Sequence, residues 1–375
     1  MKKAIYPLSA DPITYGHLNI IERSLNVFDE ILVGIGINKK KNYTFTLEER
    51  EQLAKTVLAK YGSKIQVKSF TGLLVDFAYE NDIKTIVRGV RNAPDFSFEQ
   101  LIHDINHSQN QGIDTFIVIA DQNLSHISSS AVKELQINQG SNIIKYVPMP
   151  VKHALEVKLS QQHIIGITGE IGAGKSFIAN CILKANARII TFNIDLDKIG
   201  HEILENAQEP VYQQVRTNIT KTFGPEILTN DLIDVKKLGT VIFHETQARI
   251  EFNRIMREPM YLMLRKTMYN KKGYIFVNSA LLAEEELLEF VNNNVVFVTA
   301  SDNIRRDRLM SRGYSSDEIN RRVNAQLTAQ NKIKLIEQSI EKHNYGSLVL
   351  FNNDNELNRE SIDDLMPKIY EMGAI

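Results

Sequence analysis

The sequence predicts an α/β protein with two doubly wound parallel sheets in series, and three observations support this fold class. The chain has 375 residues, whereas a domain usually has about 150, so two hydrophobic cores are expected. Short β-rich runs alternate with helical patterns in both halves, which is typical of βαβ units. Each half also places a polar loop between an apolar strand and the start of a helix, where parallel sheets bind nucleotides.

In the first half, the alternation predicts five strands separated by helices. The strands are expected at residues 2–7, 30–37, 64–70, 84–90 and 114–120, and the helices at 16–28, 46–61, 73–81 and 97–107. A helical segment at 151–159 then precedes the polar run 160–163. We therefore expect a domain boundary near Gln161, with domains at 1–160 and 161–375.

The second half repeats the α/β alternation. Strands are expected at 163–168, 187–194, 273–279 and 294–300. Helices are expected at 174–185, over a long region before residue 273, at 281–291, and from about residue 301 to the C-terminus. No internal repeat relates the two halves, which indicates two separate mononucleotide-binding folds.

Composition excludes several classes of protein. With 43% hydrophobic and 24% charged residues the chain is globular, and a net charge of -1 makes nucleic acid an unexpected partner. The single cysteine, Cys181, provides neither a disulfide nor a zinc site and is expected to be a small buried hydrophobic residue. Pro7 and Asp11 interrupt the first apolar stretch, and no run approaches the roughly 20 apolar residues that span a bilayer. We therefore expect a cytoplasmic protein without a membrane partner.

The loop after the first strand, at residues 6–17, is the first candidate site. Its backbone amides and the start of the following helix favour anionic oxygen atoms. Gly16 and His17 begin that helix, so the His17 imidazole can face the same phosphates. A histidine at this position, taken alone, is more often a cap or a surface residue.

Four segments of the first half resemble the bacterial phosphopantetheine adenylyltransferases, members of the nucleotidyltransferase superfamily. DPITYGH at 11–17 is similar to their T/H-x-G-H signature, and KNYTFTLEER, IVRGVR with DFSFEQ, and HISSSAVKEL occur at the family's approximate spacing. The resemblance covers residues 1 to about 159. It implies a Rossmann-like nucleotidyltransferase domain that joins 4′-phosphopantetheine to the α-phosphorus of ATP and releases pyrophosphate. Positioning and charge neutralisation supply the catalysis in such a reaction.

The same resemblance implies a role for individual side chains. His17 and Lys41 are the expected catalytic residues, with His17 on the ATP phosphates. Ser9 and Lys41 are expected near the acceptor phosphate and the α-phosphate, and Arg88 and Arg91 near substrate and ATP, because guanidinium groups match phosphate oxygens. The other expected contacts are, for ATP, Gly89, Glu99, Ser128, Ser129 and Ser130, and for the substrate, Leu73 and Leu74.

The first half departs from the family in its loop and near its serine run. Leu8 and Ala10 stand where the family usually has glycine and an aromatic residue. Leucine cannot adopt a positive φ cheaply, so we expect the backbone at Leu8 to approach the ligand less closely. His126 replaces an aromatic residue before the serines, which predicts altered adenine packing.

The second candidate site is a P-loop. GITGEIGAGKS matches Gly-x4-Gly-Lys-Ser as Gly169, Gly174, Lys175 and Ser176, with Gly172 between them, and it lies between an apolar strand and a helical pattern as the motif requires. The loop amides are expected to hold ATP phosphates, Lys175 to reach the β and γ oxygens, and the Ser176 hydroxyl to bind Mg²⁺.

Asp195 and Asp197 follow the next strand, which we expect to lie beside the P-loop strand. Carboxylates at that edge suit a magnesium shell or general-base catalysis, although a helix cap is the plain alternative.

Residues from about 163 to 375 resemble the dephospho-coenzyme A kinases, whose P-loop is followed by a comparable Asp-x-Asp and later by an arginine-rich lid. The resemblance implies that Asp195 takes the proton of the ribose 3′-hydroxyl and that Asp197 joins Ser176 at the metal. The lid arginines are Arg308, Arg312 and Arg322, although an arginine-rich helix is as often only a solvated face.

This half is divergent at three places. Glu258-Pro259 stands where the family has His-Pro, Ala280-Leu281-Leu282 where it has Pro-Leu-Leu, and Glu170 where it has a glycine. An additional carboxylate near phosphates is unfavourable unless it faces away or helps to hold Mg²⁺.

Together the halves predict a bifunctional enzyme that adenylylates 4′-phosphopantetheine and then phosphorylates the 3′-hydroxyl of dephospho-coenzyme A, with ATP as substrate in both domains and Mg²⁺ as cofactor. One alternative is a kinase half with a different small hydroxyl acceptor. The other is a catalytically weak nucleotide-sensing module. The resemblance also implies homo-oligomers through the first domain, because bacterial relatives form rings.

Overall fold

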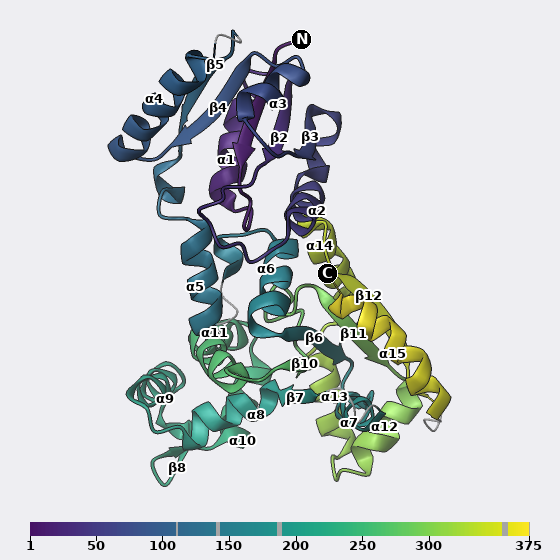
Figure 1. The fold of residues 1–375 in the computed structure, drawn as a ribbon. Helices are drawn as coiled ribbons and strands as arrows, with labels where there is room; N and C mark the ends of the chain where they lie inside the picture. The colour runs from purple at the N-terminus through teal and green to yellow at the C-terminus, as the bar shows by residue number, and fades with distance from the viewer. Residues whose placement is uncertain (110–111, 140–142, 186–189, 355–358, 375) are drawn as a thin grey trace. The chain divides into compact units, whose positions relative to one another are not determined.

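The computed structural model describes the whole chain except residues 110–111, 140–142, 186–189, 355–358 and 375. It divides into two compact units, one containing Met1–Asn138 and Asn142–Leu159 and the other containing Ser160–Ile375. Each unit is a parallel sheet with helices on both faces (Figure 1). Within the described ranges no helix is both long and apolar enough to cross a membrane.

The first unit has a five-stranded sheet of order β3-β2-β1-β4-β5, in which β1 is central. Both ladders of β1 are parallel, so the loops that follow β1 and β4 reach the same edge of the sheet. The strands are β1 (Lys3–Leu8), β2 (Glu30–Ile35), β3 (Ile65–Ser69), β4 (Thr85–Val90) and β5 (Asp114–Ile119), and the helices are α1 (Tyr15–Ser24), α2 (Leu47–Leu58), α3 (Leu74–Glu80), α4 (Ala93–His107), α5 (Ser129–Gln139) and α6 (Met149–Leu155).

The second unit has a five-stranded sheet of order β12-β11-β6-β10-β7 and a two-stranded hairpin. The strands are β6 (Gln162–Gly169), β7 (Thr191–Asp195), β8 (Leu228–Thr229), β9 (Leu232–Ile233), β10 (Gly273–Asn278), β11 (Asn294–Thr299) and β12 (Ser347–Asn352). The helices are α7 (Lys175–Ala185), α8 (Leu196–His201), α9 (Pro210–Phe223), α10 (Val235–His244), α11 (Thr246–Met268), α12 (Asp302–Met310), α13 (Ser316–Asn324), α14 (Ala329–His343) and α15 (Arg359–Gly373).

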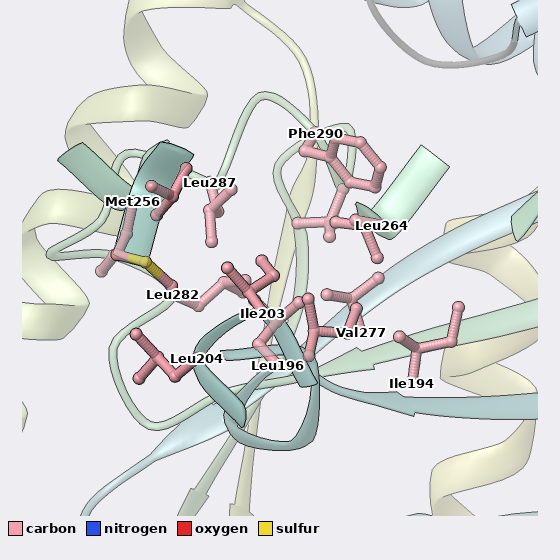
Figure 2. Close-up of a cluster of buried hydrophobic side chains, with 14 of the residues drawn as sticks. Ile194, Leu196, Ile203, Leu204, Met256, Leu264, Val277, Leu282, Leu287 and Phe290 are labelled. Carbon is pink, nitrogen blue, oxygen red and sulfur yellow. The ribbon is translucent and has the colours of Figure 1, made fainter. Parts of the chain in front are cut away.

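Alternate residues of the second sheet bury into two separate cores, because successive side chains of a strand point to opposite faces. Ile275 and Val277 join a cluster with α8, α9 and α11, part of which Figure 2 shows around Ile203, Leu204 and Leu264. Phe276 joins the other cluster, with α7 and α15, against which Cys181 is partly buried. Strands that are covered on both faces explain the nearly continuous apolar runs in the sequence.

Three sequence predictions for the second unit are wrong. β10 lies between β6 and β7, so the strand that ends at Asp195 does not neighbour the P-loop strand. Residues 281–291 form turns rather than a helix, because Glu286 has a φ of 58° and its neighbours Leu282, Leu287 and Phe290 all turn into the core (Figure 2). The region after residue 301 is not wholly helical, since 347–352 form β12 at the sheet edge.

Candidate active sites in the two domains

Asp11 organises the loop that follows β1. Its carboxylate accepts hydrogen bonds from the backbone N–H groups of Thr44 (3.1 Å) and Phe45 (3.0 Å) and from the Lys133 ammonium at 2.6 Å. Asp11 is only 5% exposed, and a buried carboxylate needs such partners. One side chain therefore fixes the β1–α1 loop, the segment before α2 and the start of α5 relative to one another.

His17 lies at the third position of α1 and completes a capping box with Thr14. Its Nδ1 accepts the backbone N–H of Thr14 at 3.0 Å, so the proton of the neutral ring lies on Nε2. Burial, followed by the positive charges of Arg91 and Lys41, lowers the pKa of His17 to about 4. At neutral pH the ring is therefore an uncharged N–H donor among cations.

Ser9 and Lys41 meet at the same edge of the sheet. The Lys41 ammonium lies 3.4 Å from the Ser9 hydroxyl, and Lys41 is otherwise exposed. The buried guanidinium of Arg50 holds the backbone below them by donating to the carbonyl oxygens of Ser9 (2.6 Å) and Gly36 (3.0 Å). Sequence reasoning missed Arg50, and no motif singles it out within the helical run of α2.

Two arginines, Arg88 within β4 and Arg91 directly after it, are paired with carboxylates of α4. Arg88 forms an ion pair with Glu99 at 2.5 Å, and Arg91 pairs with Asp95 at 2.9 Å. The cationic charge of Arg91 nevertheless reaches His17, whose pKa it lowers. Arg88 and Glu99, both expected at the site, thus lie in contact with each other.

The remaining predicted residues lie on neighbouring elements. The Ser129 hydroxyl donates to the carbonyl of Pro12 (2.9 Å), and the Ser128 hydroxyl accepts the N–H of Ala131 (3.1 Å), so these serines attach α5 to the first loop and cap it. Ser130 is exposed at the start of α5. Gly89 lies in β4, where an added Cβ would approach Ile20, and Leu73 is 59% exposed directly before α3, whose first residue is Leu74.

The P-loop of the second unit joins β6 to α7 through three glycines with positive φ: 139° at Gly169, 80° at Gly172 and 95° at Gly174. An added Cβ at Gly169 would overlap the carbonyl oxygen of Val298 in β11, and one at Gly172 would approach the carbonyl of Arg305. Both the backbone conformation and the space therefore require glycine. The loop leads into the start of α7, where backbone N–H groups favour an anion.

Lys175 and Ser176 begin α7 and face the ends of the strands. The Lys175 ammonium donates to the carbonyl of Glu170 at 3.0 Å, and burial followed by the charge of Lys332 lowers the pKa of Lys175 to about 8. The Asn278 side-chain amide donates to the Ser176 hydroxyl at 3.4 Å. Asn278 ends β10, the strand that separates Asp195 from the P-loop, and sequence reasoning missed it.

Asp195, Asp197 and Glu285 form a group of carboxylates that act on one another through their charges. Asp195 caps α8 by accepting the N–H of Asp197 at 3.0 Å. Loss of hydration and the charge of Asp195 raise the pKa of Asp197, and burial followed by the charges of Asp197 and Glu284 raises the pKa of Glu285 to about 7. The charges of Asp195 and Asp197 also act on Lys175, so the acidic residues and the lysine belong to one site.

The predicted lid arginines are placed differently from one another. Arg308 of α12 donates to the backbone carbonyls of Ala173 (3.2 Å) and Asn353 (2.8 Å), so it holds the P-loop from outside. Arg312 is exposed, and its charge reaches Lys175. Arg322 of α13 stacks over the Tyr314 ring at 4.5 Å.

Different known proteins are similar to each of the two compact units. A cytidylyltransferase-like family model matches residues 5–135, and a dephospho-CoA kinase model matches residues 163–348. The phosphopantetheine adenylyltransferase of Geotalea daltonii is 42% identical over 161 residues, which are 43% of this chain and 99% of that protein. The phosphopantetheine adenylyltransferase of Shouchella clausii is 42% identical over 156 residues, 42% of this chain and 97% of that protein.

The first domain belongs to the phosphopantetheine adenylyltransferase family. The second domain matches the dephospho-CoA kinases, so the chain is a fusion of the two families, as the sequence predicts. A solved structure described as TT1252 from Thermus thermophilus covers 56% of this chain and 97% of its own, at 20% identity and a TM-score of 0.45, too low a likeness to support an argument.

Within the adenylyltransferase domain, Leu8 does not have a positive φ. Leu8 is the last residue of β1 and pairs with Ile35, whereas Ala10 has the positive φ, 48°. Ala10 is 2% exposed, which leaves no room for a large side chain beside the Asp11 contacts. His126 is exposed and lies edge-on to Tyr146, with ring centroids 6.0 Å apart.

Within the kinase domain, the structure shows the surroundings of the residues at which the chain departs from the family pattern. The Glu170 carboxylate pairs with Arg305 at 3.2 Å, which offsets its charge beside the P-loop. Glu258 is exposed on α11, and the nearby arginines Arg254 and Arg257 pair with Glu251 and Glu286. Leu282 is fully buried in the core, and Pro259 is buried within α11 (Figure 2 shows Leu282).

Proposed function

We propose that this chain is a bifunctional enzyme of coenzyme A biosynthesis. Its first domain transfers AMP from ATP to 4′-phosphopantetheine, giving dephospho-coenzyme A and pyrophosphate, and its second phosphorylates the ribose 3′-hydroxyl of that product with a second ATP. The observation that supports the proposal is a loop suited to phosphate after the central strand of each parallel sheet, in two domains that match families whose reactions are consecutive.

In the first reaction, a phosphate oxygen of 4′-phosphopantetheine attacks the α-phosphorus and pyrophosphate leaves. The neutral Nε2–H of His17 donates to the phosphate oxygens as charge develops, and Lys41 with Ser9 orients the attacking phosphate. Arg91 and the α5 start at Ser128–Ser130 hold the β- and γ-phosphates, with Gly89 and Glu99 beside ATP. Arg88, Leu73 and Leu74 contact the substrate.

In the second reaction, the 3′-hydroxyl oxygen attacks the γ-phosphorus of ATP, its proton passes to Asp195, and ADP leaves. Lys175 and the amides of the loop Gly169–Gly174 hold the phosphates, and the charge of Arg312 acts at the same place. Arg308 and Arg322 are the other two lid arginines, and their positive charges face the transferring phosphoryl group when nucleotide binds.

Mg²⁺ fits the second site as a partner of the phosphates. Among the described residues no cluster of three or more His, Cys, Asp or Glu side chains is arranged to hold a metal ion. Magnesium in kinases needs only one or two protein ligands, because phosphates and water supply the rest. Ser176 and Asp197 provide such a pair, and bound Mg²⁺ would neutralise phosphate charge and ease the repulsion that raises the pKa of Asp197.

One observation favours a different hydroxyl acceptor for the kinase. Glu258 is an exposed carboxylate that Arg254 and Arg257 do not neutralise, and it replaces a residue that the family places near an anionic acceptor. Assembly into homo-oligomers through the first domain stays a prediction that awaits a measurement of mass in solution.

The proposal is tested by supplying the purified protein with 4′-phosphopantetheine, ATP and Mg²⁺ and identifying the products by mass. We expect pyrophosphate and dephospho-coenzyme A first, followed by coenzyme A and ADP. Accumulation of dephospho-coenzyme A without coenzyme A, while ATP is still hydrolysed, would favour another acceptor. If ATP is not hydrolysed either, the kinase half is a weak nucleotide-sensing module.

A further inference from the structure

Lys332 of α14 is a fully buried lysine that no sequence motif singles out. Its side chain is 0% exposed, although lysine is almost never fully buried unless it is paired. The ammonium donates to the carbonyl of Ala280 (2.6 Å) and to the Gln326 amide oxygen (3.1 Å), and it lies 3.1 Å from the Glu284 carboxylate. Two oxygen atoms thus accept hydrogen bonds from the ammonium group, and the Glu284 carboxylate supplies the opposite charge.

The three residues that contact the Lys332 ammonium belong to segments near the proposed kinase site. Ala280 follows Asn278 and Ser279 at the end of β10, and Asn278 donates to the Ser176 hydroxyl. Gln326 follows α13, the helix that carries Arg322. Glu284 precedes Glu285, whose carboxyl senses the charge of Asp197. A single ammonium group thus ties the turn after β10 to the end of the arginine helix.

The charge of Lys332 is as significant as its hydrogen bonds. Among the described residues neither Glu284 carboxylate oxygen has a hydrogen-bond partner, so the Lys332 ammonium is the cation that offsets this buried charge. Glu170 and Arg305 face Lys332 as well, and its own charge acts on Lys175. Loss of the ammonium would leave a buried carboxylate uncompensated next to Glu285, Asp197 and Asp195.

We propose that Lys332 is a positioning residue for phosphoryl transfer: it holds the 279–285 turn and Gln326 in the arrangement that presents Asn278, the acidic residues and Arg322 to the P-loop. It touches neither nucleotide nor acceptor. This inference rests on the proposed kinase function, and it adds a residue that the resemblance to the kinases does not supply.

The test compares Lys332→Met with Lys342→Met in the full-length protein. Lys342 lies on the same helix, is 68% exposed at its side chain and pairs with Glu289, so it is a matched control for loss of a lysine ion pair. We expect Lys332→Met to lower kcat for phosphoryl transfer by on the order of 10²-fold, since a small misplacement costs about that much. The control should keep kcat, and AMP transfer by the first domain should be normal in both.

A second pair of variants separates positioning from stability. In Lys332→Met with Glu284→Gln, the uncompensated charge is gone, so the unfolding temperature should recover. The kcat should stay low, because the Ala280 carbonyl and Gln326 are still not held. Lys332→Arg should restore part of kcat. Recovery of kcat together with stability in the double variant, or an unchanged kcat in Lys332→Met, would overturn the proposal.

The readouts also separate this inference from the proposed function. ATP turnover is measured beside transfer to dephospho-coenzyme A. If the unaltered protein turns over ATP without forming coenzyme A, the acceptor assignment fails, and the comparison of Lys332→Met with Lys342→Met is decided on ATP turnover.

Discussion

His17 shows how a local hydrogen bond sets the chemistry of one residue. The Thr14 N–H occupies Nδ1, and burial with two nearby cations disfavours the charged ring. Protonation would break the Thr14 contact as well, since a protonated Nδ1 can no longer accept a hydrogen bond. The imidazole therefore contributes directed hydrogen bonding, while Lys41 and Arg91 contribute the positive charge.

The low pKa of His17 predicts an unusual pH dependence. Because the folded pKa of about 4 is below the ordinary 6.5, the stability that comes from a neutral His17 is complete above pH 6.5 and is lost as the pH falls toward 4. For AMP transfer, kcat/KM should show no inflection near pH 6.5 attributable to this group. Steady-state profiles of the unaltered protein and His17→Gln check this. An inflection near 6.5 that disappears in His17→Gln would contradict the assignment.

Asp195 caps α8 and is also the proposed general base of the kinase, and mutation can separate these two roles. Its Oδ1 caps α8, and asparagine caps a helix as well as aspartate does. Asp195→Asn should therefore keep the thermal unfolding temperature and nucleotide affinity while lowering kcat of the kinase by about 10² to 10⁴, the usual contribution of a general base. Asp197→Asn serves as the comparison. Retained turnover in Asp195→Asn with lost turnover in Asp197→Asn would transfer the role to Asp197.

At the scale of elements, the P-loop depends on the close approach of β11. Gly169 has a φ of 139°, and a Cβ there would overlap the carbonyl of Val298, whereas Gly313 has a φ of 87° with open space around it. Gly313→Ala should cost about 1–2 kcal/mol for the backbone conformation alone. Gly169→Ala should cost about 1–3 kcal/mol more, for the overlap, and should weaken ATP binding by the kinase. Unfolding in denaturant measures the free energy of unfolding of both variants. Equal losses of this free energy would show that β11 does not confine the P-loop.

The sequence predicted the elements that carry strong local signals. The P-loop between an apolar strand and a helix, and the loop that leads into His17, are visible because glycine and helix-start residues act within a few positions. The turn at 281–291 was missed because its apolar residues suit a buried helix equally well, and the left-handed Glu286 has no sequence signature. β12 was missed because SLVLFN is short and lies at an edge, where pairing with β11 decides its conformation.

Local sequence patterns did not determine the order of the strands in the sheet or the contacts between distant segments. Asp195 was expected beside the P-loop strand, but strand order depends on how helices cover the sheet, and β10 comes between them. The residues of the site that were missed, Asn278 and Arg50, act through contacts between distant segments. A sequence does not distinguish a buried lysine such as Lys332 from a surface lysine, because its burial depends on contacts with residues that are distant in the chain.

At the scale of the whole molecule, each domain has its own sheet, its own cores and its own phosphate loop. Clusters around β1 and β2 belong to residues before 160, and the clusters around β6 and β10 belong to residues after 163. Since no catalytic group is shared in the proposed mechanisms, we expect one protein to perform two independent reactions.

The most direct test of this central claim uses one variant in each site. His17→Ala removes the proposed hydrogen-bond donor of the first domain, and Lys175→Ala removes the ammonium group proposed to bind phosphate in the second. Each variant receives either 4′-phosphopantetheine or dephospho-coenzyme A, with ATP and Mg²⁺, and products are identified by mass. We predict that His17→Ala stops pyrophosphate release but still converts dephospho-coenzyme A to coenzyme A, and that Lys175→Ala does the reverse. Loss of both reactions from either variant, in a protein that remains folded, would contradict the account.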